Sequence, residues 1–313
     1  MLSSSTRTFG SFRLAAGVLV ALLFVAPAVR PEERPCPTAQ ALSGTWAQEG
    51  EGFKIRFEPD RVVLRQNGPA RVATVLRQEP CKLVVRDQGL VSTWPISGKE
   101  RSLRLEIGKE AFLLSPSPGP SPDLDVTPLR LPPLKPVPPE RVKEISANLV
   151  ERVNRDQAVI NDPPNSPRTA AVIADNLRYL KGLVMEVGWI DISRFGKPAA
   201  AAATLIAKHG EDLPLMQAAL PILEKDVKEN GGPGEMLSVL VDGLLLTLGQ
   251  KQKYGTQLAL DEQGKPFVIP VEDPTKVDEY RKAIGIFSWS EYLQLASKSA
   301  YNGAPIRMPR PDE

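Results

Sequence analysis

The chain contains a single histidine, His209, so any imidazole-based acid, base or metal chemistry depends on that residue. Carboxylates that can act beside it as acid or base are Asp175 and Asp242. One histidine cannot form a His-rich zinc site, and the usual sequence motifs of zinc proteases, serine hydrolases, phosphate loops and dinucleotide sites are missing. We therefore expect no metal and no cofactor. In the alternative interpretation, His209 stabilises the end of an alanine-rich helix through the helix dipole.

Asp242 is the only charged group in a segment, 236–248, that is otherwise apolar almost all round. Such a segment predicts a buried helix, and a buried carboxylate needs a partner because an unpaired charge costs several kcal/mol, of order 3 to 5. Arg281 or the backbone around Tyr254 is the expected partner. Asp242 is either part of a structural pair or an acid whose pKa is raised for catalysis or ligand binding.

Several hydrogen-bonding side chains surround Gly255 within six residues. A sharp bend at the glycine would present amides and hydroxyls to a sugar, peptide or carboxylate, but the same groups can satisfy buried backbone atoms. We take as candidate ligand-binding residues Gln252, Tyr254, Thr256, Gln257 and Arg281.

The C-terminal part, over about residues 145–298, resembles an uncharacterised bacterial family known only by a domain-of-unknown-function label. The shared residues, in chain order, are Asp156-Gln157, Asp175-Asn176, Gly188-Trp189, Gly196, His209, Gln217, Gln252 to Gln257, Asp278, Arg281 and Gly285. The most specific element is Gln-x-Tyr-Gly-Thr-Gln. In that family an arginine usually follows the acidic residue of the buried helix, whereas this chain has Gly243 there, so part of a site would be missing. The resemblance implies no activity.

Residues 1–28 have the pattern of a removable signal peptide: arginines, an apolar run and then Ala26-Pro27-Ala28. The apolar run is short for a membrane span, which needs roughly 20 residues, although an uncleaved anchor remains the alternative. Cleavage removes Arg7 and Arg13 from the 39 basic residues, which leaves 37 against 37 acidic ones. A formally neutral chain argues against a nucleic-acid partner. We expect a periplasmic or secreted bacterial protein without a transmembrane span after cleavage.

Cys36 and Cys81 are the only cysteines, and in an oxidising compartment we expect them to form a disulfide that closes a loop of about 45 residues. Two unpaired buried thiols are the alternative. Residues 36–114 alternate in short apolar runs between turn signals, which predicts a small antiparallel β sheet or barrel. Gly44-Thr45-Trp46 is similar to the opening of lipocalin-type barrels, yet the segment is short for eight strands.

The rest of the chain predicts a change of architecture, so the fold class is α+β multidomain: the small β sheet or barrel, then a mainly α-helical bundle with one β-hairpin. Residues 115–139 form a proline-rich linker, residues 140–300 the helical domain with a hairpin at 256–271, and residues 301–313 a disordered tail.

The sequence leaves three hypotheses for the function. The first hypothesis is an exported envelope protein that binds a peptide, glycan or protein partner; the second is a hydrolase of envelope polymer or peptide that uses His209 with a carboxylate; the third is a structural scaffold.

Overall fold

The computed structural model describes residues 36–37, 42–49, 52–66, 68–99, 101–119, 121–159, 162 and 166–309. The predicted signal peptide at 1–28 and the last residues of the tail, 310–313, lie outside these ranges. Residues 34–313 form one unit of the chain by their internal contacts.

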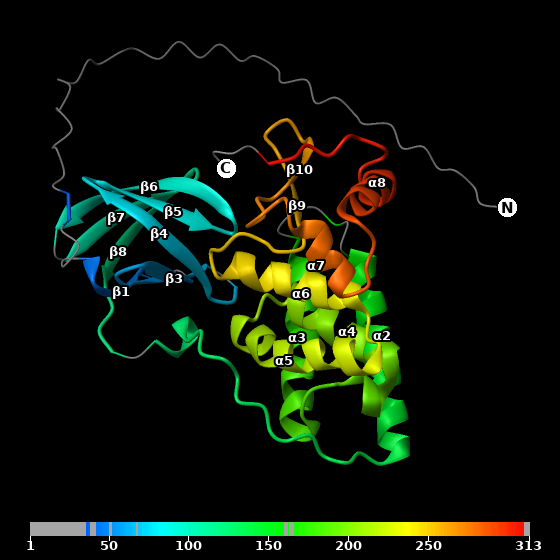
Figure 1. Cartoon of the computed structure of the whole chain (residues 1–313). Coiled ribbons are helices and arrows are strands. Elements are labelled where there is room, and N and C mark those ends of the chain that lie inside the picture. Colours follow the sequence, from blue (N-terminus) through cyan, green and yellow to red (C-terminus); the bar gives the residue numbers. More distant parts are fainter. Residues whose placement is uncertain are drawn as a thin grey trace, which may run out of the picture. The chain divides into compact units, whose positions relative to one another are not determined.

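Eight antiparallel strands form a closed barrel in which each strand pairs with the next and β1 pairs with β8 (Figure 1). The strands are β1 (Gly44–Ala47), β2 (Phe53–Phe57), β3 (Arg61–Gln66), β4 (Arg71–Glu79), β5 (Lys82–Asp87), β6 (Leu90–Lys99), β7 (Ser102–Ile107) and β8 (Glu110–Pro116). Alternate residues of β2, namely Phe53, Ile55 and Phe57, point into the core, as their spacing predicts.

The barrel is consistent with the lipocalin-like opening, and it corrects the expectation that the segment is short for eight strands. Most strands are only four to seven residues long, and tight turns such as Gln88-Gly89 join them. Trp46 is buried in the barrel core and its indole nitrogen donates to the carbonyl of Leu42 at 3.0 Å. The predicted disulfide between Cys36 and Cys81 is present and ties the entry segment to the start of β5. A disulfide fits a compartment other than the reducing cytoplasm.

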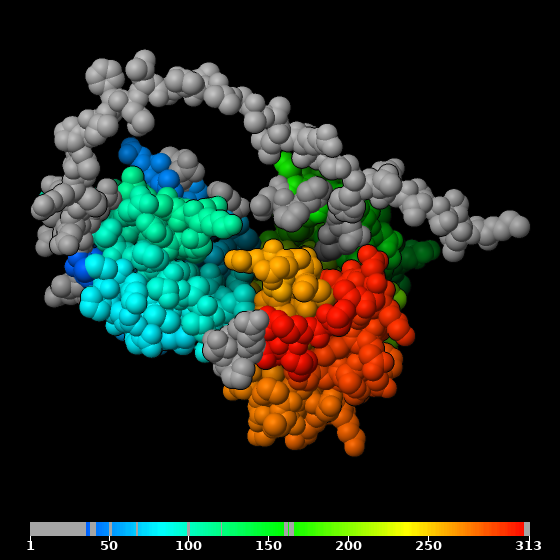
Figure 2. Space-filling view, turned by 90° about the horizontal axis from the view of Figure 1, so that it is seen from above, coloured from blue at the N-terminus to red at the C-terminus, as the bar shows by residue number. Residues whose placement is uncertain are grey.

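The helical region begins at Pro139 and contains seven α-helices and one two-stranded sheet in its described residues. The helices are α2 (Pro139–Val159), α3 (Pro167–Val187), α4 (Ile192–His209), α5 (Leu213–Asn230), α6 (Gly234–Thr247), α7 (Val277–Ala283) and α8 (Trp289–Ala300). The hairpin is β9 (Leu258–Leu260) with β10 (Pro266–Val268), shorter than the range 256–271 expected for it. Figure 2 shows the hairpin, α7 and α8 as one continuous orange-to-red part of the surface. No helix in the described part of the chain is both long enough and apolar enough to cross a membrane.

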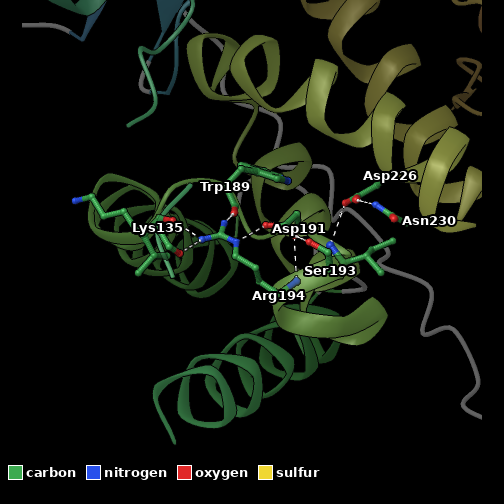
Figure 3. Close-up of polar contacts among 9 residues, drawn as sticks. Lys135, Trp189, Asp191, Ser193, Arg194, Asp226 and Asn230 are labelled. Carbon is green, nitrogen blue, oxygen red and sulfur yellow. Dashed lines mark hydrogen bonds and ion pairs between the residues drawn. The ribbon is translucent and has the colours of Figure 1, made fainter. Parts of the chain in front are cut away.

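The linker between barrel and helices lies along the helical region and is not a free spacer. A short 3-10 helix, η1 (Pro122–Leu124), places Leu124 in the helical core, and further apolar residues of the linker pack against that core. The backbone amide of Leu129 donates to the carbonyl of Pro214 at 2.9 Å. Arg194 donates to the carbonyl of Lys135 at 2.8 Å and to the carboxylate of Asp191 (Figure 3). Apolar burial and hydrogen bonds thus fix the course of the linker.

The chain end also differs from the expectation of disorder over 301–313. Arg307 forms a bridge with Phe267 of β10, and the backbone amide of Val268 donates to the carbonyl of Arg307 at 2.9 Å. The hydroxyl of Ser297 donates to the carbonyl of Ala304 at 2.7 Å. Residues 301–309 thus run beside the hairpin, whose outer strand offers backbone groups that a nearby extended segment can pair with.

Candidate functional site

Asp242 lies on α6 with no solvent exposure, and its carboxylate receives four hydrogen bonds from the segment that follows the helix. The backbone amides of Lys253, Tyr254 and Thr256 donate at 2.8 Å each, and the Thr256 hydroxyl donates at 2.8 Å. Burial raises the pKa of Asp242, and these hydrogen bonds act against that rise. Of the two expected partners, the backbone around Tyr254 is therefore the one that contacts the carboxylate.

Arg281 on α7 instead holds carbonyl oxygens. Its guanidinium donates to the carbonyl of Tyr254 at 2.9 Å and to that of Phe287 at 2.7 Å. Asp242 and Arg281 therefore bind the same segment, residues 253–256. Asp242 accepts hydrogen bonds from its backbone amides, and Arg281 donates to one of its carbonyls. Burial lowers the pKa of Arg281.

The bend at Gly255 depends on the absence of a side chain. Gly255 has φ of +70°, and a Cβ there would collide with the indole of Trp289. The Trp289 indole nitrogen donates to the carbonyl of Gly255 at 3.1 Å. A glycine is needed here because only glycine adopts positive φ without strain and leaves this space.

Gln252 and Thr256 are buried with their polar atoms used inside the protein. The amide nitrogen of Gln252 donates to the carbonyls of Gln257 and Ile269, and its oxygen accepts from the Gln257 amide at 2.8 Å. The Tyr292 hydroxyl donates to the carbonyl of Thr256 at 2.6 Å. These contacts hold the bend onto the hairpin and α8, which is the structural alternative weighed for this segment.

Tyr254 differs from its neighbours because its hydroxyl has no hydrogen-bond partner among the described residues, although the residue is only 5% exposed. Burial raises the pKa of this phenol, and the carboxylates of Asp242 and Glu224 add to that rise. The side chain lines a cleft of about 760 Å³ whose other walls come from the end of α5, the start of α6 and the end of α7. We call this space the Tyr254 cleft.

The glycine-rich segment before α6 forms one wall of the Tyr254 cleft. The helix begins at Gly234, and no side chain caps its N-terminus. The first amides of a helix lack partners in the preceding turn; here the amide of Met236 donates to the carbonyl of Pro233 at 3.1 Å, which leaves those of Gly234 and Glu235 to an acceptor. Gly234 also packs tightly on Ile284, where a Cβ would collide with the carbonyl oxygen. Sequence reasoning missed this wall, although the run Gly231-Gly232-Pro233-Gly234 was a visible signal of close backbone packing.

His209 lies at the end of α4 and contacts Asp156 of α2 through its Nδ1 atom. Asp156 is buried and also accepts from the side chain of Gln157 at 3.3 Å. Neither His209 nor Asp156 lines the Tyr254 cleft. The imidazole of His209 thus contacts a neighbouring helix, and it forms no hydrogen bond with Asp242 or Tyr254.

Asp175 on α3 forms an ion pair with Arg152 of α2 at 2.7 Å, and it is nearly half exposed. The hydrogen bond from Arg152 lowers the pKa of Asp175. A carboxylate with a lowered pKa is a poor general acid near neutral pH. The three candidate catalytic residues therefore lie in three separate environments: Asp175 in a surface ion pair, His209 beside Asp156, and Asp242 under the bend. In the described residues, no group of acidic, histidine and cysteine side chains has the arrangement of a metal site.

Comparison with known protein families matches residues 143–303 to a family of unknown function, DUF6624. The chain belongs to this family, and the match covers α2 from residue 143 onward, the other helices, the hairpin and the bend at Gly255. No curated protein matches the chain. No solved structure matches it either.

Proposed function

We propose that this is a periplasmic or secreted binding protein whose helical region takes an extended peptide segment in the Tyr254 cleft. The observation that carries the proposal is Tyr254, which lines a cleft of about 760 Å³ and whose hydroxyl has no hydrogen-bond partner among the described residues. A cleft of this size lies in the usual range for ligand sites, about 300 to 1,000 Å³. The predicted signal at 1–28 and the disulfide support the compartment.

The lining of the cleft favours a peptide over a glycan. Its charged groups are of both signs, with Glu224 and Glu235 opposed by Lys228 and Lys282, and the start of α6 adds backbone amides. A peptide offers carbonyl acceptors and side chains of either charge to such a surface. Sugar recognition commonly uses the open face of an aromatic ring, and the ring of Tyr254 is too buried to provide one.

The proposal is tested by screening the purified chain on a random peptide array and measuring affinities of selected peptides by calorimetry. We expect Tyr254→Phe to weaken binding roughly fivefold, since a net hydrogen bond contributes about 1 kcal/mol. Ala283→Arg, at an exposed position on the cleft rim, should block binding through bulk. Tyr179→Phe is the matched control. Tyr179 lies on α3, packs against the guanidinium of Arg152 and does not line the cleft.

Peptides that bind Tyr254→Phe and Ala283→Arg as tightly as the unaltered protein would place the site elsewhere and end the proposal. A parallel array of envelope glycans distinguishes the ligand class. Binding of glycans alone, lost in Ala283→Arg, would keep the cleft and overturn the peptide.

Hydrolysis is the second candidate, and the contact between His209 and Asp156 is the observation that favours it. A carboxylate beside an imidazole can orient it and raise its basicity, as in acid–base catalysis. The decisive comparison is turnover of pooled envelope polymers and peptides by the unaltered protein and by His209→Ala. Equal turnover would remove His209 from any mechanism.

A further inference from the structure

A second, smaller cavity lies between the end of α4 and α6, where it borders Gly243, the residue after Asp242. Its volume is about 160 Å³, and Lys208 of α4 and Gly243 of α6 both line it. A water molecule occupies roughly 30 Å³ in the liquid, so the space corresponds to about five water-sized groups. The cavity therefore suits a molecule of a few heavy atoms. It is separate from the Tyr254 cleft, with which it shares no lining residue.

Lys208 brings a positive charge into this cavity without a counterion. It forms no ion pair or hydrogen bond with any described residue, and burial lowers the pKa of its amine. Asp156 attracts the amine at a distance, but its carboxylate is already held by His209. A partly buried ammonium without an acceptor is unfavourable, and an incoming anionic group would relieve that cost.

The stem of Lys208 packs on α6 at Gly243. A Cβ at this position would lie 3.6 Å from Cγ and 3.8 Å from Cε of Lys208, so the stem rests on the bare face of α6. A longer side chain at Gly243 would fill the space between the helix and the amine. Gly243 thus lies directly beneath the lysine stem, at a position where a long side chain would compete with it for this space.

Glu211 provides the opposite charge on the wall of the same cavity. It follows α4 by two residues, has φ of +48°, and forms no ion pair with any described residue. Its carboxylate attracts the Lys208 amine without contacting it. A cation and an anion that face one small cavity and do not pair with each other match a ligand that carries both charges.

The remaining walls combine amides with apolar side chains. Gln88 and Gln257 supply amide groups, and the Gln257 nitrogen is already used by the Thr256 hydroxyl at 2.9 Å, which leaves its oxygen as an acceptor. Met216, Leu246 and Ile269 form an apolar side. A short aliphatic group fits there, while an ammonium finds further acceptors in the amides.

We propose that this cavity binds a small free α-amino acid with a short aliphatic side chain, its carboxylate at Lys208 and its ammonium at Glu211. The inference goes beyond the peptide proposal, because it concerns another cavity and a ligand that needs both free charges on one small molecule. A peptide chain end carries only one of these charges next to its side chain. The small volume of the cavity favours amino acids with short side chains over the larger ones.

Calorimetry on the purified full chain tests this directly with L-alanine, propionate, ethylamine and L-tryptophan. L-alanine should bind, propionate and ethylamine should bind at least about tenfold more weakly, which is ~1.4 kcal/mol each, and L-tryptophan should not bind. Propionate as tight as L-alanine would overturn the zwitterion. No heat from L-alanine at millimolar concentration would overturn the site.

Variants then locate the binding. Lys208→Met and Glu211→Gln should each weaken L-alanine by at least about tenfold, and Lys298→Met, an exposed lysine in the last turn of α8, is the matched control. Glu211 is exposed, so Glu211→Gln keeps the test available if Lys208→Met lowers stability. Undiminished L-alanine binding in Glu211→Gln would refute the assignment. Peptide binding in the Tyr254 cleft should be unchanged by Glu211→Gln, which separates failure here from failure of the proposed function.

Discussion

The barrel and the helical region differ in what their interiors contain. Among the described residues, every buried polar or charged side chain lies between Asp156 and Arg281, and none lies in β1 to β8. The barrel core is built from apolar side chains such as Ile55, Leu64 and Trp94. Five buried aspartates stand in the helical region, namely Asp156, Asp191, Asp212, Asp226 and Asp242.

The difference follows from how each architecture satisfies its backbone. A closed barrel pairs its strands all round, so few backbone groups need help from side chains. Each helix leaves its first amides without partners, and the connections between helices add more. Asp191 and Asp212 cap α4 and α5, and Asp242 holds the bend after α6. Buried carboxylates thus accept hydrogen bonds from backbone amides in the helical region, whereas the barrel strands satisfy their backbone groups by pairing with one another.

The largest expected effect comes from removing the carboxylate beneath the bend. Asp242→Ala leaves buried backbone amides and the Thr256 hydroxyl without an acceptor, so we expect the free energy of unfolding to fall by about 3 to 5 kcal/mol. Urea unfolding followed by circular dichroism measures the change. Asp60→Ala, at an exposed barrel turn, is the control and should change stability by less than about 0.5 kcal/mol. Equal effects at both positions would remove the distinction between the two regions.

Reduction of the Cys36–Cys81 disulfide should have the next largest effect, and it should act on the barrel. The bond links residues 45 apart in sequence, and a loop of that length contributes about 3 to 4 kcal/mol in the chain-entropy account. In the double variant Cys36→Ala with Cys81→Ala, the barrel should unfold at a lower denaturant concentration. The fluorescence of Trp46 and Trp94 follows this unfolding. Unchanged unfolding would mean that the apolar barrel core alone determines its stability.

The Asp191 cap should show a pH dependence of stability that comes from a buried carboxylate, a kind of residue that the described strands of the barrel do not contain. Burial alone would raise the pKa of Asp191, but hydrogen bonds from Ser193 and Arg194 outweigh it and hold the pKa below its ordinary value. The folded pKa is below the unfolded one, so the contribution is present above an ordinary pKa of about 4 and is lost as pH falls through the lowered value.

Asp191→Asn removes that contribution. We expect a loss of about 2 kcal/mol at pH 7 and a smaller difference from the unaltered protein at strongly acidic pH. Urea unfolding of both proteins across this range is the measurement. A difference that stays constant down to the lowest pH would show that the charge on Asp191 contributes nothing.

A pair of nearly isosteric substitutions gives the smallest and sharpest contrast. Val85→Thr places a hydroxyl in the dry barrel core and should cost about 1 to 2 kcal/mol. Thr204→Val removes a buried hydroxyl that donates to the carbonyl of Ala200 within α4 at 2.9 Å, and should cost less than about 1 kcal/mol. Thermal unfolding of both variants suffices. The reverse order of effects would contradict the division of the interior into an apolar and a polar half.

Local patterns in the sequence were enough to predict much of the fold. Alternation in Phe53 to Phe57 is typical of a strand, and Ser288 with Glu291 three residues later is typical of the capping box that begins α8. Barrel closure was harder to foresee, because the pairing of β1 with β8 joins residues about seventy positions apart and depends on packing around the whole circle.

The candidate site was predictable in its residues and not in its geometry. Asp242 stood out as a charge in an apolar helix, and Gln252 to Gln257 stood out around a glycine. Whether such groups contact a ligand or one another depends on which atoms the bend directs into the protein. The spacing of residues in the sequence does not predict that direction. Most of these groups bond within the protein, whereas the Tyr254 hydroxyl and the side-chain oxygen of Gln257 have no hydrogen-bond partner among the described residues. Lys208 was overlooked because an isolated lysine after an alanine run is typical of an exposed helix end.

The linker has a consequence for how the chain tolerates cleavage. Residues before Lys135 are held by the helices through Leu129 and Pro214, through Val126 and Gln217, and through Arg194. A protease that cuts just after Lys135 would divide the covalent chain without freeing the segment ahead of the cut. The same bonds would let two separately produced fragments, joined at this point only by docking, reassemble into the native protein.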